Sequence, residues 1–239
     1  MNFNFKLKSK KCLTLKSDEV HIWSVCLLDN ERDIYYLSSI LSKDEQERAG
    51  DFRFLRDQER FIMTRGILRC LLAEYSGVTP QSIEIMYGLH GKPCISQEKS
   101  LHFNVSHSGD YAVLAFNRDY EIGIDLEYID RNLELEEMVL SIFSQAELNY
   151  WEKLHPEEKV EFFFKVWVGK EAFLKTLGKG WLENDEKIKF EEKYLFEQNL
   201  DGEVSKNELG VLHYFQYVPE YASAFFIKGP SLEPMFFNW

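Results

Sequence analysis

Two acidic residues lie two positions apart in the segment Gly-Ile-Asp-Leu-Glu at 123–127. Side chains alternate along a β-strand, so Asp125 and Glu127 are expected on one face and the intervening aliphatic residues on the other, toward the core. Two carboxylates on a rigid face suit a hard cation such as Mg²⁺ that also binds substrate phosphates. A solvated strand end on an acidic protein is the alternative interpretation.

A helical segment contributes a third carboxylate. Glu171 lies midway between Trp167 and Lys175, four residues from each, so the three share one side of a helix. Lys170 adjoins them, and a carboxylate with two ammonium groups suits a phosphate ester with its metal. The alternatives are an ordinary surface ion pair between Glu171 and Lys175 and a packing role for Trp167.

The segment Phe-Asn-Val-Ser-His-Ser-Gly at 103–109 places two hydroxyls and an imidazole where a strand runs into a tight turn. Ser106 and His107 predict a hydrogen-bonding loop, with turn capping by the serines as the alternative. A hydrolase triad is disfavoured, because no acid partner is placed for the adjacent Ser and His. The Gly-Lys-Pro turn at 91–93 presents the ammonium group of Lys92.

The first half is locally basic although the chain is acidic overall. Arginine suits multidentate phosphate contacts, and two or three of its arginines are expected to line a pocket while the others occupy a solvated helix face. Arg56 and Arg60 are four residues apart and share a face. The six arginines of this region are Arg48, Arg53, Arg56, Arg60, Arg65 and Arg69.

Capping residues and periodicity predict the elements that position these side chains. Ser42 and Ser144 each begin a capping box, so a helix is expected to start after each of them. Longer helices are expected at 57–75 and 160–177, each followed by a glycine. The expected strands are 83–86, 101–106, 111–116, 121–127, 210–218 and 221–227.

The second half repeats the order of elements of the first. Residues 60–69 align with residues 166–175, and this register places Arg69 on Lys175. The alignment suggests a weak internal duplication. We therefore expect two α+β halves joined near residues 117–120, with a ligand site in the cleft between them.

The chain has 239 residues, with 40 acidic against 28 basic side chains and a formal net charge of −12. This balance disfavours broad binding to nucleic acid, whose phosphates require clustered Lys and Arg. With 45% hydrophobic and 15% aromatic residues, the composition predicts a soluble globular protein with a sizeable core.

Neither a signal peptide nor a membrane span is expected, because no apolar run follows the basic N-terminus and none approaches about 20 residues. The cysteines are scattered without metal-type spacing. They predict reduced thiols in the cytoplasm, without a disulfide framework or a zinc site. The four are Cys12, Cys26, Cys70 and Cys94.

Four motifs in order carry a family resemblance: GKP at 91, FNVSHS at 103, GIDLE at 123 and WVGKEAFLK at 167. Together they resemble the 4′-phosphopantetheinyl transferases of the surfactin-synthetase-activating (Sfp) type. The resemblance runs from about Ser42 through Gly180 and includes RFLRDQERFIMTRGILR. It implies an α+β fold of two similar halves, 1–118 and 119–239, each a small antiparallel sheet packed with helices, with the active site in the cleft between them.

The resemblance also implies site residues. Asp125, Glu127 and Glu171 would hold Mg²⁺ with the pyrophosphate of coenzyme A. Phosphate contacts would come from Lys170 and Lys175. The remaining coenzyme A contacts, with the two arginines toward the nucleotide or its 3′-phosphate, would be Arg48, Arg60, Lys92, Ser106 and His107.

The implied reaction is a Mg²⁺-dependent transfer in which a serine hydroxyl of an acyl or peptidyl carrier protein attacks the β-phosphate of coenzyme A. Its products are the holo-carrier and 3′,5′-ADP. Mg²⁺, Lys170 and Lys175 would stabilise the charge on the leaving group, and Glu171 would take the serine proton directly or through a metal-bound water. The competing hypotheses are a Mg²⁺-dependent phosphodiesterase or nucleotide hydrolase and a non-catalytic coenzyme A binding module.

Carrier proteins are commonly acidic, so docking on this acidic chain is expected to be local. A candidate surface is 128–143, which is richer in apolar residues than one buried stripe requires; the alternative is that all of them are core. These residues are Leu133, Met138, Val139, Leu140, Ile142 and Phe143. We expect a cytoplasmic monomer that binds neither nucleic acid nor membrane.

Overall fold

The computed structural model describes residues 13–28, 31–88, 90–96, 98, 100–179, 204–207 and 209–239. Cys12, the basic N-terminus and Gly180, on which the sequence interpretation drew, lie outside the described residues. The helices are α1 (Glu31–Ser39), α2 (Lys43–Gly50), α3 (Leu55–Ser76), the 3₁₀ turn η1 (Pro80–Ser82), α4 (Glu136–Ile142), α5 (Gln145–Trp151) and α6 (Pro156–Leu177). The strands are β1 (Glu19–Cys26), β2 (Ile85–Tyr87), β3 (Pro93–Ile95), β4 (His102–Ser108), β5 (Tyr111–Asn117), β6 (Ile122–Tyr128), β7 (Val204–Asn207), β8 (Gly210–Phe215), β9 (Tyr221–Ile227) and β10 (Glu233–Asn238).

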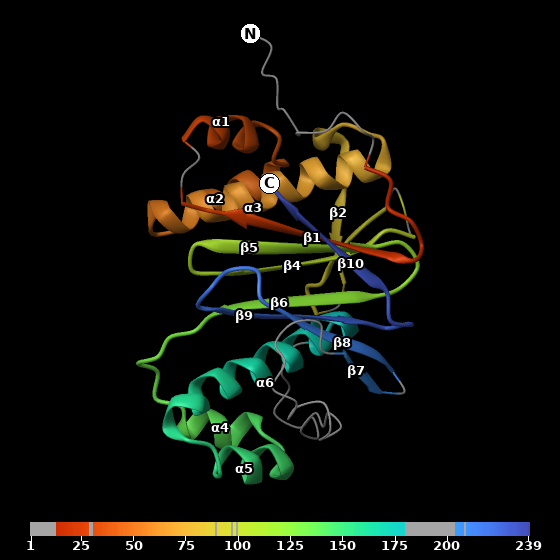
Figure 1. Cartoon of the computed structure of the whole chain (residues 1–239). Helices are drawn as coiled ribbons and strands as arrows, with labels where there is room; N and C mark the ends of the chain where they lie inside the picture. Colours follow the sequence, from red (N-terminus) through yellow and green to blue (C-terminus); the bar gives the residue numbers. More distant parts are fainter. Residues whose placement is uncertain are drawn as a thin grey trace.

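The elements form four layers (Figure 1). Helices α1–α3 cover one face of a sheet with strand order β10-β1-β5-β4, and α4–α6 cover one face of a second sheet with order β6-β9-β8-β7. The other faces of the two sheets pack on each other through a cluster that contains Ile22, Val113, Ile124 and Phe225. The fold is therefore α+β with small sheets packed against helices, as predicted.

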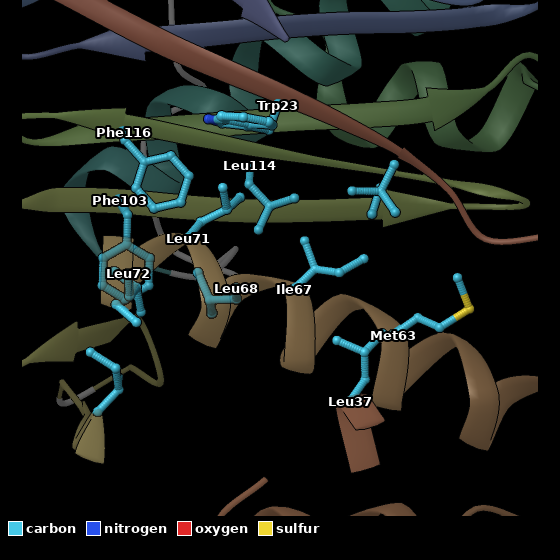
Figure 2. Packing of buried hydrophobic residues seen from close by; sticks show 14 of the residues in the cluster. Trp23, Leu37, Met63, Ile67, Leu68, Leu71, Leu72, Phe103, Leu114 and Phe116 are labelled. Carbon is cyan, nitrogen blue, oxygen red and sulfur yellow. The ribbon is translucent and has the colours of Figure 1, made fainter. Parts of the chain in front are cut away.

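The first helical layer is held by apolar side chains of α3. Ile67, Leu68 and Leu71 are buried in a cluster that includes Leu114 and Phe116 of β5. Figure 2 shows the side chains of α3 on the side of the helix that faces Leu114 and Phe116. Complete burial of each large aliphatic side chain contributes about 1.5–3 kcal/mol, so this cluster fixes the helix that carries several of the arginines.

The two halves repeat one topology. The strand order β1-β5-β4 of the first sheet recurs as β6-β9-β8 in the second. Both α3 and α6 have 22 residues and end at a left-handed glycine, Gly77 and Gly178. The halves are similar, as predicted, but the predicted register is wrong. The two helices begin at positions 55 and 156, an offset of 101 residues that pairs Arg69 with Lys170 and not with Lys175.

The last strand departs from the predicted division of the chain after residue 118. β10 pairs in parallel with β1 of the first sheet and places Phe237 opposite Trp23. These two rings stack at a centroid distance of 4.8 Å, and Ser24 Oγ donates a hydrogen bond to Asn238 Oδ1 at 2.8 Å. Because β10 buries aromatic surface on the first sheet, it belongs to that sheet and makes it mixed, where an antiparallel sheet was expected.

Most of the predicted elements are present with ends shifted by a few residues. Helices follow both capping boxes, and the long helices end at the predicted glycines. The strand expected at 83–86 begins two residues later, as β2, because the 3₁₀ turn η1 comes directly before Ile83. β1 was not predicted, since six successive residues in it are buried and no alternation reveals a strand. None of the described helices is long and apolar enough to cross a bilayer.

Helix α6 approaches the second sheet closely at Gly123 of β6. A Cβ at this position would overlap with the Ala172 carbonyl and with Thr176 of α6. We expect Gly123→Ala to lower the free energy of unfolding by about 1–3 kcal/mol or more, because backbone must move to admit the methyl group. Gly50→Ala is the control, because nothing lies within 4 Å of its Cβ. Urea denaturation measures both, and equal stability of the two variants would contradict this packing.

Candidate active site

The site forms where β4 and β6, the edge strands of different sheets, lie against each other. Side chains of β4 satisfy backbone donors of β6. Asn104 Oδ1 accepts the Ile124 N–H at 2.9 Å, and Ser108 Oγ accepts the Tyr128 N–H at 3.1 Å. A buried donor without such a partner would cost about 1–3 kcal/mol. The polar residues of the FNVSHS motif therefore hold β6 in a fixed register beside β4.

Asp125 is the most buried of the predicted metal ligands, with 1% of its surface exposed. Its Oδ1 accepts hydrogen bonds from Ser106 Oγ at 2.8 Å and from Lys175 Nζ at 2.6 Å. The same ammonium also donates to Ser106 Oγ at 2.9 Å. Its Oδ2 is also buried, and no described residue gives it a hydrogen bond. A solvated strand end is thus excluded, and one carboxylate oxygen is left for a ligand.

Glu127 lies on the same face, two residues farther along β6. Its carboxylate accepts hydrogen bonds from Ser108 Oγ at 2.8 Å and from Trp167 Nε1 at 3.4 Å. Desolvation by burial, followed by the negative charge of Asp125, raises the pKa of Glu127. Trp167 therefore contacts a site residue as well as packing in the core. A cation between the two carboxylates would relieve the repulsion that raises this pKa.

Glu171 occupies the face of α6 that is turned toward β6. Trp167, one turn before it, contacts Glu127, and Lys175, one turn after it, contacts Asp125. Because residues four apart share a helix face, Glu171 lies between these two contacts. Its side chain is half-buried. The surface ion pair between Glu171 and Lys175 considered above gives way to a pair between Lys175 and Asp125 at 2.6 Å.

The side chains gathered here have the donor chemistry that a hard dication prefers. Three carboxylates on one strand and the facing helix match the oxygen ligands that Mg²⁺ prefers, and the unpartnered Asp125 Oδ2 is an oxygen that such an ion would satisfy. Among the described residues, no group of three or more His, Cys, Asp or Glu side chains is close enough together to hold a metal ion without moving. The Lys175 ammonium instead compensates Asp125.

Lys170 is not brought into the site. Its side chain is fully buried, and its Nζ donates to Glu147 Oε2 at 2.6 Å and to the Ile142 carbonyl at 2.8 Å. Lys170 directly precedes Glu171, and successive residues are about 100° apart around a helix, so the two side chains point in different directions. The predicted phosphate contact of Lys170 is therefore replaced by a contact with α4 and α5.

His107 is on the rim of the site with an exposed side chain. Desolvation, followed by the positive charges of Lys175 and Arg60, lowers the pKa of His107. The structure thus brings His107 near two predicted phosphate ligands. The lowered pKa favours the uncharged ring, which offers one donor and one acceptor nitrogen.

Arg60 and Arg56 converge on one carboxylate. Their Nη2 atoms lie 2.5 Å and 2.6 Å from Asp110 Oδ1, at the turn between β4 and β5. The Asp110 N–H in turn donates to Tyr221 Oη of the second half at 3.2 Å. Arg48 is exposed on α2 and lies over the Phe61 ring at 5.4 Å. The predicted pairing of Arg56 and Arg60 on one face is confirmed.

Lys92 joins the two halves. Its Nζ lies 2.5 Å from Glu121 Oε2 and donates to the Thr176 carbonyl near the end of α6 at 2.9 Å. A cation at a helix C-terminus is favourable, because the last carbonyls carry partial negative charge. The GKP loop is thereby fixed beside the strand and the helix that supply the carboxylates.

Sequence reasoning missed several residues that hold the site. Asn104 was available in the FNVSHS motif, where a polar side chain stands in an otherwise apolar stretch. Asp110 follows a glycine in the turn but has no pattern that pairs it with α3. Glu147 was identified only as a capping residue, although it also binds Lys170. Pairs of this kind join distant segments, and spacing along one element does not reveal them.

Glu121 gives the link between the halves a pH dependence. A hydrogen bond from His102, followed by one from Lys92, lowers the pKa of Glu121 from 4.5 to about 2. Its stabilising contribution is therefore present above pH 4.5 and is lost as the pH falls toward 2. Since Glu121 is 46% exposed, we expect Glu121→Gln to cost less than about 1 kcal/mol at pH 7. Urea denaturation should show this difference shrinking between pH 4.5 and 2; a constant difference would contradict the assignment.

Comparisons with known proteins match each half of the chain to the profile of a known family. Residues 29–119 match the family profile described as 4′-phosphopantetheinyl transferase, N-terminal, and residues 121–217 match that of the 4′-phosphopantetheinyl transferase superfamily. The 4′-phosphopantetheinyl transferase HetI of Nostoc sp. is 41% identical over 171 residues, which cover 70% of this chain and 72% of that protein.

Two further relatives are matched over a smaller share of their length. The 4′-phosphopantetheinyl transferase Sfp of Bacillus subtilis is 30% identical over 64% of this chain and 65% of its own. AcpT of Escherichia coli, also named a 4′-phosphopantetheinyl transferase, is 33% identical over 51% of this chain and 58% of its own. The alignments thus span less than two thirds of these two proteins. With one profile on each structural half and the similarity to HetI, the chain belongs to the 4′-phosphopantetheinyl transferase family.

Proposed function

We propose that this protein transfers the 4′-phosphopantetheine group of coenzyme A to a serine of acyl or peptidyl carrier proteins and releases 3′,5′-ADP. The observation that supports this most is the buried Asp125, whose Oδ1 is bound by Lys175 while its Oδ2 has no partner in the part of the chain that the structure describes. A carboxylate half-compensated by a lysine suits a site that takes up a metal ion together with a pyrophosphate. Membership of the family supports the reaction type.

Asp125, Glu127 and Glu171 are the proposed Mg²⁺ ligands. Bound Mg²⁺ would neutralise pyrophosphate oxygens and the charge that develops as the nucleotide leaves. Asp125 and Glu127 project from one rigid strand that Asn104 and Ser108 hold in register. This arrangement positions two of the three acids before any ligand arrives, and pre-positioned charge costs no reorganisation during the reaction.

Lys175 is the proposed cation for the leaving phosphate. Its side chain is 28% exposed and its ammonium already lies beside Asp125 and Ser106. A cation held by Asp125 would neutralise its charge, and Lys175 would then be able to donate to a phosphate oxygen. Glu171, half-buried on the same face of α6, is the proposed acceptor of the proton of the carrier serine.

The coenzyme A contacts are proposed to follow the β4 end of the site. Arg60, with Arg48 farther out on α2, is proposed for the nucleotide phosphate, and Ser106 and His107 for the groups beside Lys175. Arg60 is held by Asp110 at 2.5 Å, so a bound phosphate would compete with that carboxylate. For Lys92 we propose that the ammonium orders the loop while its backbone faces the nucleotide.

Intact-mass spectrometry of an apo-carrier protein tests the proposed reaction. With this protein, coenzyme A and Mg²⁺, we expect the carrier to gain the mass of one phosphopantetheine on its serine, and EDTA to abolish the gain. Release of 3′,5′-ADP without a modified carrier would instead support a hydrolase. Tight binding of coenzyme A without either product on a panel of carriers would support a non-catalytic binding module.

Replacing an acid of the site should lower the activity far more than replacing an acid elsewhere on α6. We expect Glu171→Gln and Asp125→Asn to lower kcat/KM at least about a hundredfold, because replacing groups that only support metal ligands already costs 10–100-fold. Glu157→Gln is the matched control, since Glu157 also lies on α6 but is exposed in the first turn of the helix. The comparison is made by initial rates of holo-carrier formation. Similar losses in all three variants would contradict the assignment.

The segment 128–143 is proposed to contact the carrier protein. Its predicted apolar set divides in the structure. Val139, Ile142 and Phe143 are buried in the core and Met138 packs against it, whereas Leu133 and Leu140 are 38% and 65% exposed. The proposed contact is therefore confined to the exposed members of the set. Apolar docking of this kind allows two acidic proteins to associate locally.

We expect Leu133→Asp and Leu140→Asp each to raise the KM for the carrier roughly tenfold, because a hot-spot contact contributes more than about 1 kcal/mol. The KM for coenzyme A should not change. Leu209→Asp is the control, because Leu209 is 50% exposed in the turn between β7 and β8. Steady-state kinetics with varied carrier measures these values. An unchanged carrier KM in both test variants would show that the carrier docks elsewhere.

The remaining proposals concern the setting of the reaction. We propose a cytoplasmic enzyme, because coenzyme A and carrier proteins are intracellular in the reaction implied by the family. We also propose a monomer, since two halves in one chain supply both sides of the site. Size-exclusion chromatography with light scattering tests the second proposal; a stable dimer at working concentration would contradict it.

A further inference from the structure

Each half of the protein contains one buried ion pair at an equivalent position. In the first half, Arg69 Nε of α3 lies 2.5 Å from Glu45 Oε2. In the second half, Lys170 Nζ of α6 lies 2.6 Å from Glu147 Oε2. All four side chains are at most 3% exposed. Both glutamates are the third residue of a capped helix, so the two pairs occupy the same place in the repeated topology.

The pair in the second half connects three helices. Glu147 Oε2 also accepts the Ser144 N–H at 2.6 Å, which begins α5. Lys170 Nζ donates in addition to the carbonyl of Ile142, the last residue of α4. The first half uses the same device, where Arg69 Nη1 donates to two backbone carbonyls beyond α3. The cation on the long helix therefore ties it to the preceding capped helix in both halves.

Only one of these pairs stands beside carboxylates of the proposed site. The residue after Lys170 is Glu171, whereas the residue after Arg69 is Cys70. In the first half, Arg69 thus anchors α3 although the next residue is not an acid that the anchor could orient. This shows that the ion pair has a structural role that does not depend on phosphate.

Anchoring by Lys170 also fixes the direction of the residues beside it. Successive residues are about 100° apart around a helix, so a fixed Lys170 determines where the next side chain points. On its opposite side, α6 presses against Gly123 of β6, where no side chain intervenes. The helix is therefore held from two sides, and Glu171 is held with it between the contacts of Trp167 and Lys175.

We propose that Lys170 and Glu147 are a positioning pair that sets the rotation of α6 and thereby aims Glu171 at the metal site, and that Lys170 makes no phosphate contact. This inference rests on the proposed function, because the metal site belongs to it. It assigns Glu147, a residue outside the site, an effect on metal affinity. It also predicts that an arginine can replace Lys170, as in the first half.

The test compares Glu147→Gln with the matched variant Glu45→Gln, which makes the same change in the equivalent pair. Mn²⁺ binding in the presence of coenzyme A is measured by electron paramagnetic resonance, coenzyme A binding by calorimetry and folding by thermal denaturation. We expect both variants to lose thermal stability. Glu147→Gln should raise the Kd for Mn²⁺ at least about tenfold, as supporting residues of metal ligands do, while Glu45→Gln should leave it within about twofold.

Two further variants keep the test decisive. Lys170→Arg should fold and bind Mn²⁺ and coenzyme A within about threefold of the unaltered protein. If Glu147→Gln does not fold, Glu147→Asp replaces it in the test. This variant keeps the charge but shortens the side chain by one methylene group, and we expect the same rise in the Kd for Mn²⁺.

Three results would overturn the proposal: unchanged Mn²⁺ affinity in the Glu147 variant, equal loss in the Glu45 variant, or loss of coenzyme A binding in Lys170→Arg. Failure of the unaltered protein to bind Mn²⁺ with coenzyme A would instead reject the proposed function itself.

Discussion

The contact between β4 and β6 is the constraint on which the rest of the structure depends. Two edge strands of different sheets approach each other there, and side chains of β4 provide the acceptors that a neighbouring strand would otherwise supply. Asn104 and Ser108 thereby join the halves through hydrogen bonds to β6. Ser106, between them, donates to Asp125. The side chains of β4 that join the two halves therefore also position the buried Asp125.

The same contact explains the electrostatics of the site. Asp125 and Glu127 face α6 in a partly desolvated place, and burial followed by their mutual repulsion raises the pKa of Glu127. One lysine compensates Asp125, so negative charge remains to be neutralised. Binding of a cation between Asp125 and Glu127 would remove this repulsion and so stabilise the folded protein. Stability and affinity for a metal are therefore linked through the same two side chains.

The internal duplication allows structural and chemical roles to be separated. Both halves keep a long helix, a left-handed glycine at its end and a buried cation that binds a capping glutamate. The second half places carboxylates on the facing strand and helix. Comparison of Arg69 with Lys170 therefore indicates which parts of the WVGKEAFLK motif maintain the fold and which are left for chemistry.

Much of the fold and part of the site could be predicted from local patterns. Alternation in GIDLE predicted the shared face of Asp125 and Glu127, and capping boxes predicted two helix starts. Residue spacing does not show which neighbour a side chain meets, so the burial of Lys170 against Glu147, 23 residues earlier, could not be predicted. The pairing of β10 with β1 was missed for the same reason, because its partners lie at the opposite end of the sequence.

Asp125, Glu127 and Glu171 together are proposed to hold the metal ion that binds the pyrophosphate of coenzyme A. The most direct test of this proposal is the anomalous diffraction of Mn²⁺ in crystals grown with coenzyme A. We expect one peak, from an ion that is coordinated by Asp125 Oδ2 and by the other two carboxylates and lies next to the pyrophosphate. A peak held by other residues, or bound coenzyme A with Asp125 Oδ2 still unligated at saturating Mn²⁺, would contradict it.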